Sequence, residues 1–161
     1  MQTALKNLEN VKNGDLKKIL NVCMDECCRL TNSKLSYFAT MNDTEDVLTM
    51  QGWSNSAMAN CAMITKPIVY LLEDTGMWGD AVRERKAIIT NDYKNLVKPT
   101  KKGYPAGHVE VQKHMNAPIF DGSLVVGVIG VGNKAADYND NDAKTIVAFM
   151  SEAWKIIKTK V

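Results

Sequence analysis

Apolar residues recur at helical spacing near the start of the chain. Leu5, Leu8 and Val11 share one face of a first segment, which stops at Asn13-Gly14. Asp15 is a suitable N-cap for a second helix that runs to about Leu30. The apolar stripe of this helix consists of Leu16, Ile19, Leu20, Cys23, Cys27 and Leu30.

The last part of the chain repeats this pattern. We expect Asn141 or Asp140 to cap a terminal helix. Its apolar face consists of Ile146, Phe149, Met150, Ala153 and Ile157. The stripes of the two long helices predict a homodimer in which the terminal helices pair with those of a second copy. The alternative is that both stripes pack on the chain's own sheet.

Alternating spacing predicts two β-hairpins between these helices. In the first, residues 35–40 alternate, Asn42-Asp43 forms a turn, and residues 47–53 return. In the second, residues 114–120 and 124–132 flank Asp121-Gly122. The run 124–132 is apolar on both faces, which is typical of a central strand, and its glycines permit close approach of another backbone or a bulge.

Shorter elements fill the space between the hairpins. Residues 54–64 predict a short helix or an irregular crossing, and residues 66–73 a strand that Pro67 restricts to a sheet edge. Residues 76–86 turn helical after two glycines, and residues 87–90 form a short strand. The whole order predicts an α+β domain with a largely antiparallel sheet and both terminal helices on one face.

Length and charge narrow the class of protein. A chain of 161 residues suits one domain, and a formal net charge of +2 with scattered lysines and acids gives no basic face for nucleic acid. No apolar run reaches the roughly 20 residues that span a membrane, and no signal peptide is recognisable. We therefore expect a cytoplasmic domain without membrane contact. Both ends are helical, as in a piece cut from a larger protein.

The cysteines carry no clear chemical signature. Cys23, Cys27 and Cys28 fall in one predicted helix, and Cys61 lies in the crossing. No histidine accompanies them at the spacing of a zinc site. We interpret them as reduced, small apolar residues, with metal or disulfide roles as the alternative.

Candidate functional residues are concentrated in residues 89–111, where polar side chains lie among glycines and a proline. His108 suits ligand hydrogen bonding, or metal or haem ligation, but it equally suits a cap for its own loop. Asn91 and Asp92 suit turn hydrogen bonds, and Arg83 suits a surface charge or an ion pair with Asp92. His114, within a strand, is interpreted as a surface or edge residue. Asn133-Lys134 is expected to tie the sheet end to residues 91–93.

Five motifs occur in the order and at about the spacing of one branch of the GAF domains, found in sensor histidine kinases. They are Trp53, "GMWGDAVRERKAIITNDY", "GYPAGH", "MNAPIFDG" and "VVGVIGVGNKAADYNDND". The chain therefore resembles a single GAF domain over residues 1–161, with a core of about 16–157. The resemblance implies a six-stranded antiparallel sheet with helices on both faces, and the N- and C-terminal helices together.

The resemblance also implies where a ligand binds. The family's site lies between the sheet and the connection from the third strand to the fifth. On this sequence the implied residues are Trp53, Trp78, Arg83, Asn91, Asp92, Tyr93 and His108. Aromatic walls with a few orienting polar groups suit a small-molecule pocket. The alternative for Trp78 is a plug that closes the core.

The implied function is that of a regulatory sensor, which binds a small molecule or cofactor and signals to an attached output domain such as a histidine kinase. The chain has no phosphoacceptor helix and no ATP-binding glycine motif, so the domain itself is not expected to be an enzyme. Three alternatives remain open. They are a haem-binding redox or gas sensor that uses His108 or Cys61, a cysteine-dependent free methionine sulfoxide reductase, and a degenerate domain that only dimerises.

Overall fold

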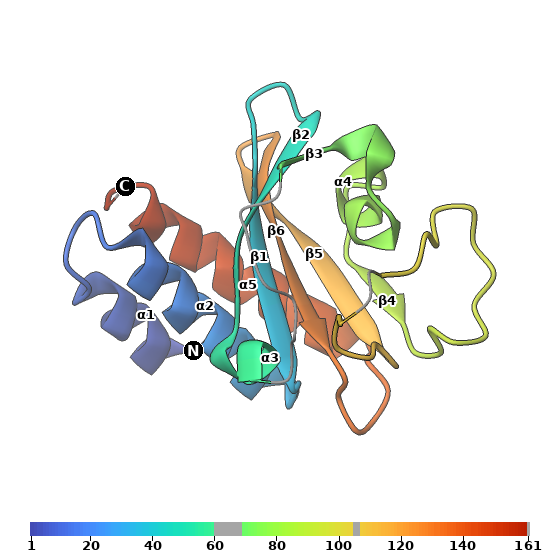
Figure 1. Cartoon of the computed structure of the whole chain (residues 1–161). Helices are drawn as coiled ribbons and strands as arrows, with labels where there is room; N and C mark the ends of the chain where they lie inside the picture. Colours follow the sequence, from blue (N-terminus) through green and yellow to red (C-terminus); the bar gives the residue numbers. More distant parts are fainter. Residues whose placement is uncertain (60–68, 105–106, 161) are drawn as a thin grey trace.

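The computed structural model describes the chain except for residues 60–68, 105–106 and 161. Six strands and several helices make up the described part (Figure 1). The helices are α1 (Gln2–Glu9), α2 (Leu16–Thr31), α3 (Asn55–Ala59), α4 (Asp80–Arg83) and α5 (Asp140–Ile157), with 3-10 turns η1 (Leu72–Asp74) and η2 (Met77–Gly79). The strands are β1 (Leu35–Met41), β2 (Val47–Trp53), β3 (Val69–Leu71), β4 (Ile88–Thr90), β5 (His114–Asp121) and β6 (Leu124–Gly132).

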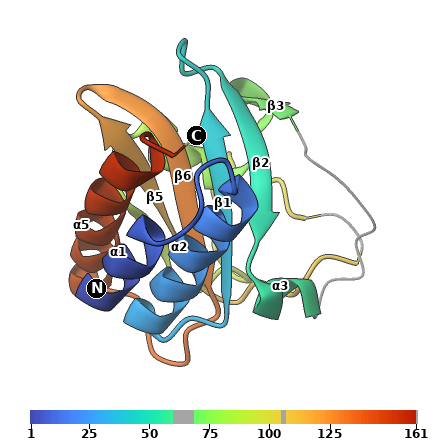
Figure 2. The same cartoon turned by 90° about the vertical axis from the view of Figure 1, so that its left-hand side faces the viewer.

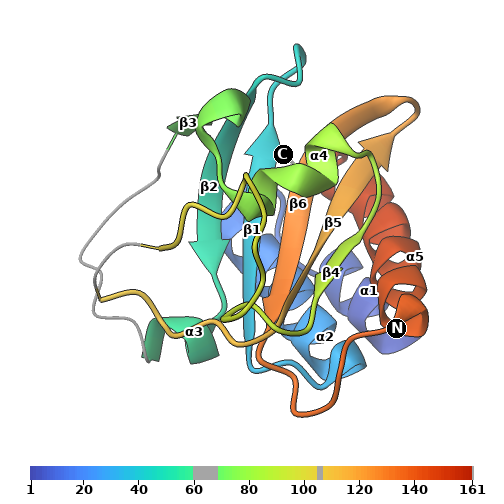
Figure 3. The same cartoon turned by 90° about the vertical axis from the view of Figure 1, so that its right-hand side faces the viewer.

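The strands form one six-stranded sheet in the order β3-β2-β1-β6-β5-β4, and every neighbouring pair is antiparallel. Figure 2 shows α1, α2 and α5 together in front of one face, and α5 contacts both α1 and α2. The short helix α4 and the connection from β4 to β5 cover the other face (Figure 3). The expected α+β fold, with helices on both faces and the terminal helices together, is confirmed.

The hairpins follow the predicted pattern with one shift in a turn. Asp121 and Leu124 are the last paired residues of β5 and β6, so the loop is Gly122-Ser123 and not Asp121-Gly122. Gly122 has φ +62°, and Ser123 is not among the residues with positive φ. A positive φ at only the first loop residue is the pattern of a type II′ turn, which requires glycine there.

The two long helices, α2 and α5, have different N-cap residues. The Asp15 carboxylate accepts from the Lys18 amide at the start of α2, as predicted. Helix α5 is capped by Asn139, and the prediction of Asn141 or Asp140 was wrong. The Asn139 side chain accepts from the Asn141 and Asp142 amides, and the Asp142 carboxylate accepts from the Asn139 amide. This reciprocal capping box provides hydrogen-bond acceptors for backbone amides that would lack them if Asn141 were the cap.

The apolar stripes of the terminal helices are buried within the chain. They pack together and on the sheet with Phe38, Met115 and Ile129. The buried stripe residues include Ile19, Leu20, Cys23, Ile146, Phe149, Met150 and Ile157. The stripes are therefore used inside the monomer, which was the alternative to pairing with a second copy. A smaller cluster around Leu48, Val82 and Val128 fills the other face.

Candidate functional site

A cavity of about 320 Å³ lies on the face of the sheet that carries α4. Its floor comes from β1, β5 and β6, and its walls come from the end of β2, η2 and the connection before β5. This volume is at the lower end of the range for small-molecule pockets. The position, between the sheet and the connection that follows β3, is where the resemblance placed a ligand.

Four of the seven predicted site residues line this cavity, namely Trp53, Trp78, Tyr93 and His108. Arg83, Asn91 and Asp92 are not among its lining residues. The three hold the surrounding structure, each through a different set of contacts.

Arg83 fixes the turns that carry Trp78. Its guanidinium pairs with Asp80 at 2.8 Å and donates to the Thr75 carbonyl at 2.8 Å and to the Thr75 hydroxyl at 2.7 Å. The predicted ion pair with Asp92 is not formed. Because Asp80 is on the same helical turn as Arg83, it is the nearer carboxylate.

Asp80 is 2% exposed and joins α4 to the β4–β5 connection. Besides Arg83, its carboxylate accepts from Lys98 at 2.7 Å and from the Thr100 hydroxyl at 2.8 Å. Burial alone would raise its pKa, but the hydrogen bonds from Lys98, Thr100 and Arg83 outweigh burial and lower it. This charged cluster anchors one end of the cavity wall to α4.

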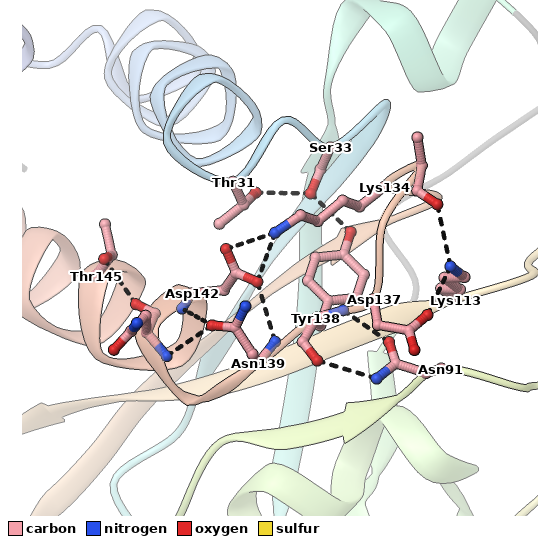
Figure 4. A network of polar contacts seen from close by, with 12 residues as sticks. Thr31, Ser33, Asn91, Lys113, Lys134, Asp137, Tyr138, Asn139, Asp142 and Thr145 are labelled. Atoms are coloured by element: carbon pink, nitrogen blue, oxygen red, sulfur yellow. Dashed lines mark hydrogen bonds and ion pairs between the residues drawn. The ribbon is translucent and has the colours of Figure 1, made fainter.

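Asn91 clamps the other end of the same wall. Its amide donates to the Tyr138 carbonyl at 3.0 Å, and its oxygen accepts from the Tyr138 amide at 2.8 Å (Figure 4). Asp92 closes an exposed turn by accepting from the Asn95 amide at 3.1 Å. Asp92 therefore makes the local turn contact that was predicted, whereas Asn91 makes a contact to a distant segment and not to its own turn.

The tie between the sheet end and residues 91–93 was predicted for Asn133-Lys134, but Asn91 and Tyr138 make it. Asn133 accepts instead from the Gln112 amide at 2.8 Å and donates to the Glu110 carbonyl at 2.7 Å. Its left-handed backbone, with φ +59°, turns the side chain back toward that segment. Lys134 pairs with Asp142 at 2.7 Å.

Two groups of aromatic rings wall the cavity. In one, the Trp78 ring makes edge contacts with Tyr37 and Tyr70 at centroid distances of 6.1 and 5.1 Å. The other is a row of four rings, in which neighbouring centroids are 5.7 Å apart from His114 to Tyr93, 5.7 Å from Tyr93 to Tyr104, and 4.9 Å from Tyr104 to His108. Both geometries are favourable for aromatic pairs.

The Tyr37 ring lies over β6 because Gly130 has no side chain. A Cβ at Gly130 would stand 1.9 Å from the Tyr37 ring, closer than any real contact. The Tyr37 hydroxyl donates to the Asn116 side-chain oxygen at 2.8 Å, and burial raises the pKa of this hydroxyl well above its usual value. At Gly130, the group that approaches the β6 backbone closely is therefore an aromatic ring.

His114 and Asn116 also line the cavity, although His114 was interpreted as an edge residue. Asn116 is 2% exposed, and its amide contacts His114 Nδ1 at 3.0 Å. Burial lowers the pKa of His114 to about 4, against an opposing attraction from Asp80. The sequence signal that could have identified these two cavity residues was their alternating position along the strand. Polar residues two apart in a strand beside a central strand share a face, and that face must hold polar partners.

His108 has a defined imidazole orientation. Its Nδ1 lies 2.7 Å from the Val109 carbonyl. Because a carbonyl oxygen only accepts, Nδ1 donates, and Nε2 of the neutral ring carries the lone pair. The residue therefore makes the local contact predicted for a loop cap, and within the described residues its Nε2 lone pair has no hydrogen-bond donor.

The thiols of α2 are not part of the cavity lining. Cys23, Cys27 and Cys28 are free, while Cys61 lies outside the described residues. Burial raises the pKa of Cys23 to about 12 and of Cys28 to about 11, and it also raises that of Cys27. Within the described residues no three histidine, cysteine or acidic side chains are grouped to hold a metal ion. In the same part of the chain, no helix has the length and apolarity to cross a membrane.

Comparison with known sequences gives a consistent picture. The model of a family described as GAF domain matches residues 13–158. A methyl sulfide methyltransferase-associated sensor from Methanosarcina acetivorans is 44% identical over 157 residues, which are 98% of this chain. The chain spans only 16% of the length of that relative.

Solved structures of low sequence identity share the fold. The GAF domain of a phosphoenolpyruvate-protein phosphotransferase from Coxiella burnetii has a TM-score of 0.77 at 13% identity, covering 98% of this chain and 90% of that chain. The GAF domain of a two-component sensor histidine kinase from Bacillus halodurans has a TM-score of 0.67 at 14% identity, with coverages of 90% and 95%.

Proposed function

Because the chain belongs to the GAF domain family, we propose that it is a regulatory sensor domain. In this proposal it binds a small molecule in the cavity of about 320 Å³ and passes the signal to an attached output domain, such as a histidine kinase. The observation that carries the proposal is the cavity itself. Aromatic rings wall it, and a few oriented polar groups, including Asn116 and the two histidines, face it.

The proposed output lies outside the chain. The relative from Methanosarcina acetivorans is named a sensor, and it is far longer than the region matched here. We propose that this chain is likewise one module of a larger signalling protein. The end of α5 and the start of α1 are the connections through which such a module would act on its neighbours.

The proposed mechanism is a shift between two arrangements of the terminal helices. A ligand shifts such an equilibrium only by its differential affinity for the two states. The contacts that would carry the difference in affinity start at Asn91, two residues before the cavity residue Tyr93. They run through Tyr138 to Ser33, whose hydroxyl lies 2.7 Å from that of Tyr138, and on to Thr31 at the end of α2 (Figure 4).

A homodimer remains part of the proposal, but it does not use the buried stripes. Their residues are covered within the monomer, so the outer faces of α1, α2 and α5, seen in Figure 2, would meet a second copy. Sedimentation at high protein concentration tests this. A monomer at every concentration would remove the dimer from the proposal and leave ligand binding unaffected.

The test of ligand binding starts with native mass spectrometry of the purified domain, to identify a compound that co-purifies. We expect His108→Ala to weaken binding of that compound while the melting temperature stays nearly unchanged, because the His108 ring donates to the carbonyl of its own chain neighbour, Val109. A large drop in melting temperature with unchanged affinity of the folded fraction would contradict the recognition role.

A second candidate function is a haem-based sensor, and one observation favours it. His108 donates from Nδ1 to a backbone carbonyl and keeps the Nε2 lone pair, the tautomer in which an imidazole ligates iron. When bound, haem would supply redox chemistry or gas binding at its iron. Among the described cavity residues, His108 would hold the iron. A Soret band in the purified domain that His108→Ala removes would support this candidate, and a colourless protein from haem-supplemented cells would reject it.

The three thiols in the described part of the chain do not favour a reductase. Attack on a sulfoxide requires a cysteine of lowered pKa in the cavity. The thiols of Cys23, Cys27 and Cys28 have raised pKa values and lie outside the cavity lining. We propose that these cysteines are structural.

A further inference from the structure

We propose that His114, Asn116 and Tyr37 form a fixed, uncharged hydrogen-bond donor at one end of the cavity, and that His108 supplies an acceptor at the other end. The matching ligand is an uncharged aromatic heterocycle with an acceptor on one edge and an N–H or O–H donor on another. This inference rests on the proposed function, because it names the class of ligand for the same cavity.

The first step is the direction of the hydrogen bonds along the cavity floor. The Tyr37 hydroxyl donates to the side-chain oxygen of Asn116 at 2.8 Å, so in the structure the NH₂ group of that amide is turned toward His114. The amide nitrogen of Asn116 then lies 3.0 Å from His114 Nδ1. An amide NH₂ group only donates, so His114 Nδ1 accepts, and the proton of the neutral ring is on Nε2.

The second step is the state of the two imidazoles. Burial of His114 favours its neutral form, so at neutral pH Nε2–H is an uncharged donor. Within the described parts of the chain this nitrogen has no hydrogen-bond partner, although the ring lines the cavity. His108 has the opposite tautomer, because its Nδ1 donates to Val109. The row of four rings therefore ends in a donor at β5 and an acceptor in the loop.

The third step is the charge of the ligand. Among the described lining residues there is no carboxylate and no arginine. Lys102 is the one cationic side chain there, and its ammonium donates to the Asp74 carbonyl at 2.9 Å. A cationic ligand would lose its hydration in this cavity without gaining a paired opposite charge, which is strongly unfavourable. An anionic ligand would have only Lys102 among the described lining residues, and its ammonium is already held by the Asp74 carbonyl. Aromatic walls favour instead a flat, uncharged ring system.

Four probes of similar ring size separate these requirements. Naphthalene has neither polar group, quinoline has an acceptor, indole has a donor, and 4-quinolone has both on opposite edges. We expect quinoline and indole each to bind about threefold to tenfold more tightly than naphthalene, the gain of one net hydrogen bond, and 4-quinolone to bind most tightly. His114→Phe should abolish the advantage of quinoline but not that of indole. His108→Phe, the matched control that keeps a ring on Tyr104, should do the reverse.

A ligand-free measurement tests the donor independently. In protein with ¹⁵N-labelled histidine, two-bond nitrogen–proton correlations should show His114 as the Nε2–H tautomer and His108 as the Nδ1–H tautomer. Tyr37→Phe should release the Asn116 amide and mix the His114 tautomers, while leaving His108 unchanged. An Nδ1–H tautomer at His114 in the unaltered protein would overturn the proposed donor.

The outcomes also separate this inference from the proposed function. If all four probes bind with equal affinity, the cavity binds ligands but the assigned donor and acceptor are wrong. If none binds, naphthalene included, while native mass spectrometry still finds a co-purified compound, the ligand class is overturned and the ligand-binding function stands. If no compound co-purifies either, both are overturned.

Discussion

At the scale of single residues, Gly130 decides how the floor of the cavity is built. We expect Gly130→Ala to destabilise the domain by about 1–3 kcal/mol, because the added methyl group would overlap the Tyr37 ring. Gly132→Ala is the matched control, since a Cβ there meets its nearest atom at 3.4 Å. Urea unfolding of both variants measures the difference. Equal losses in the free energy of unfolding for the two variants would show that the position of the Tyr37 ring does not depend on Gly130.

His114 makes the stability of the domain depend on pH. Its pKa is lowered from 6.5 to about 4 in the folded state, so the unfolded chain binds a proton more readily. The contribution of His114 to the free energy of unfolding is fully present above pH 6.5. It decreases as the pH drops below that value and is lost by about pH 4. The free energy of unfolding lost on acidification is up to about 3 kcal/mol, at 1.36 kcal/mol per unit of pKa difference.

The measurement is urea unfolding between those two pH values for the unaltered protein and His114→Phe. We expect the loss of stability on acidification to be smaller in the variant, because phenylalanine takes up no proton. Parallel pH profiles would show that His114 is not buried in its neutral form.

At the scale of elements, the start of α5 depends on one side chain. We expect Asn139→Ala to cost about 1 kcal/mol, the usual effect of removing an N-cap. Asn141→Ala lies two residues further on and serves as control, with little expected change. Thermal unfolding with circular dichroism compares them. A larger effect at Asn141 would contradict the cap seen in the structure.

At the scale of the whole molecule, Asn91 connects the cavity wall to the layer of terminal helices. Asn91→Ala leaves the backbone groups of Tyr138 without their partner, so we expect a loss of about 1–3 kcal/mol and faster amide exchange in residues 91–96 and 134–139. Asp92→Ala is the neighbouring control, because it only opens an exposed turn. If both variants exchange alike, the clamp does not connect the two regions.

The sequence by itself determined the elements and their order. Hairpins and amphipathic helices depend on contacts between residues near in sequence, and these leave a periodic pattern of two or about three and a half. The motifs also indicated the space between the sheet and the connection that follows the third strand, and a cavity lined by Trp53, Trp78, Tyr93 and His108 lies there. The resemblance, rather than periodicity, supplied that second result.

Only the tertiary structure decided which polar groups face the cavity and which hold its walls. Asn91 is next but one to Tyr93 in the sequence, yet its amide reaches Tyr138, which is 47 residues away. His114 has the pattern of an edge residue, but the cavity wall covers its strand and makes it an uncharged cavity residue. Hydrogen-bond direction and burial depend on partners distant in sequence, and a local pattern of residue types carries no information about those partners.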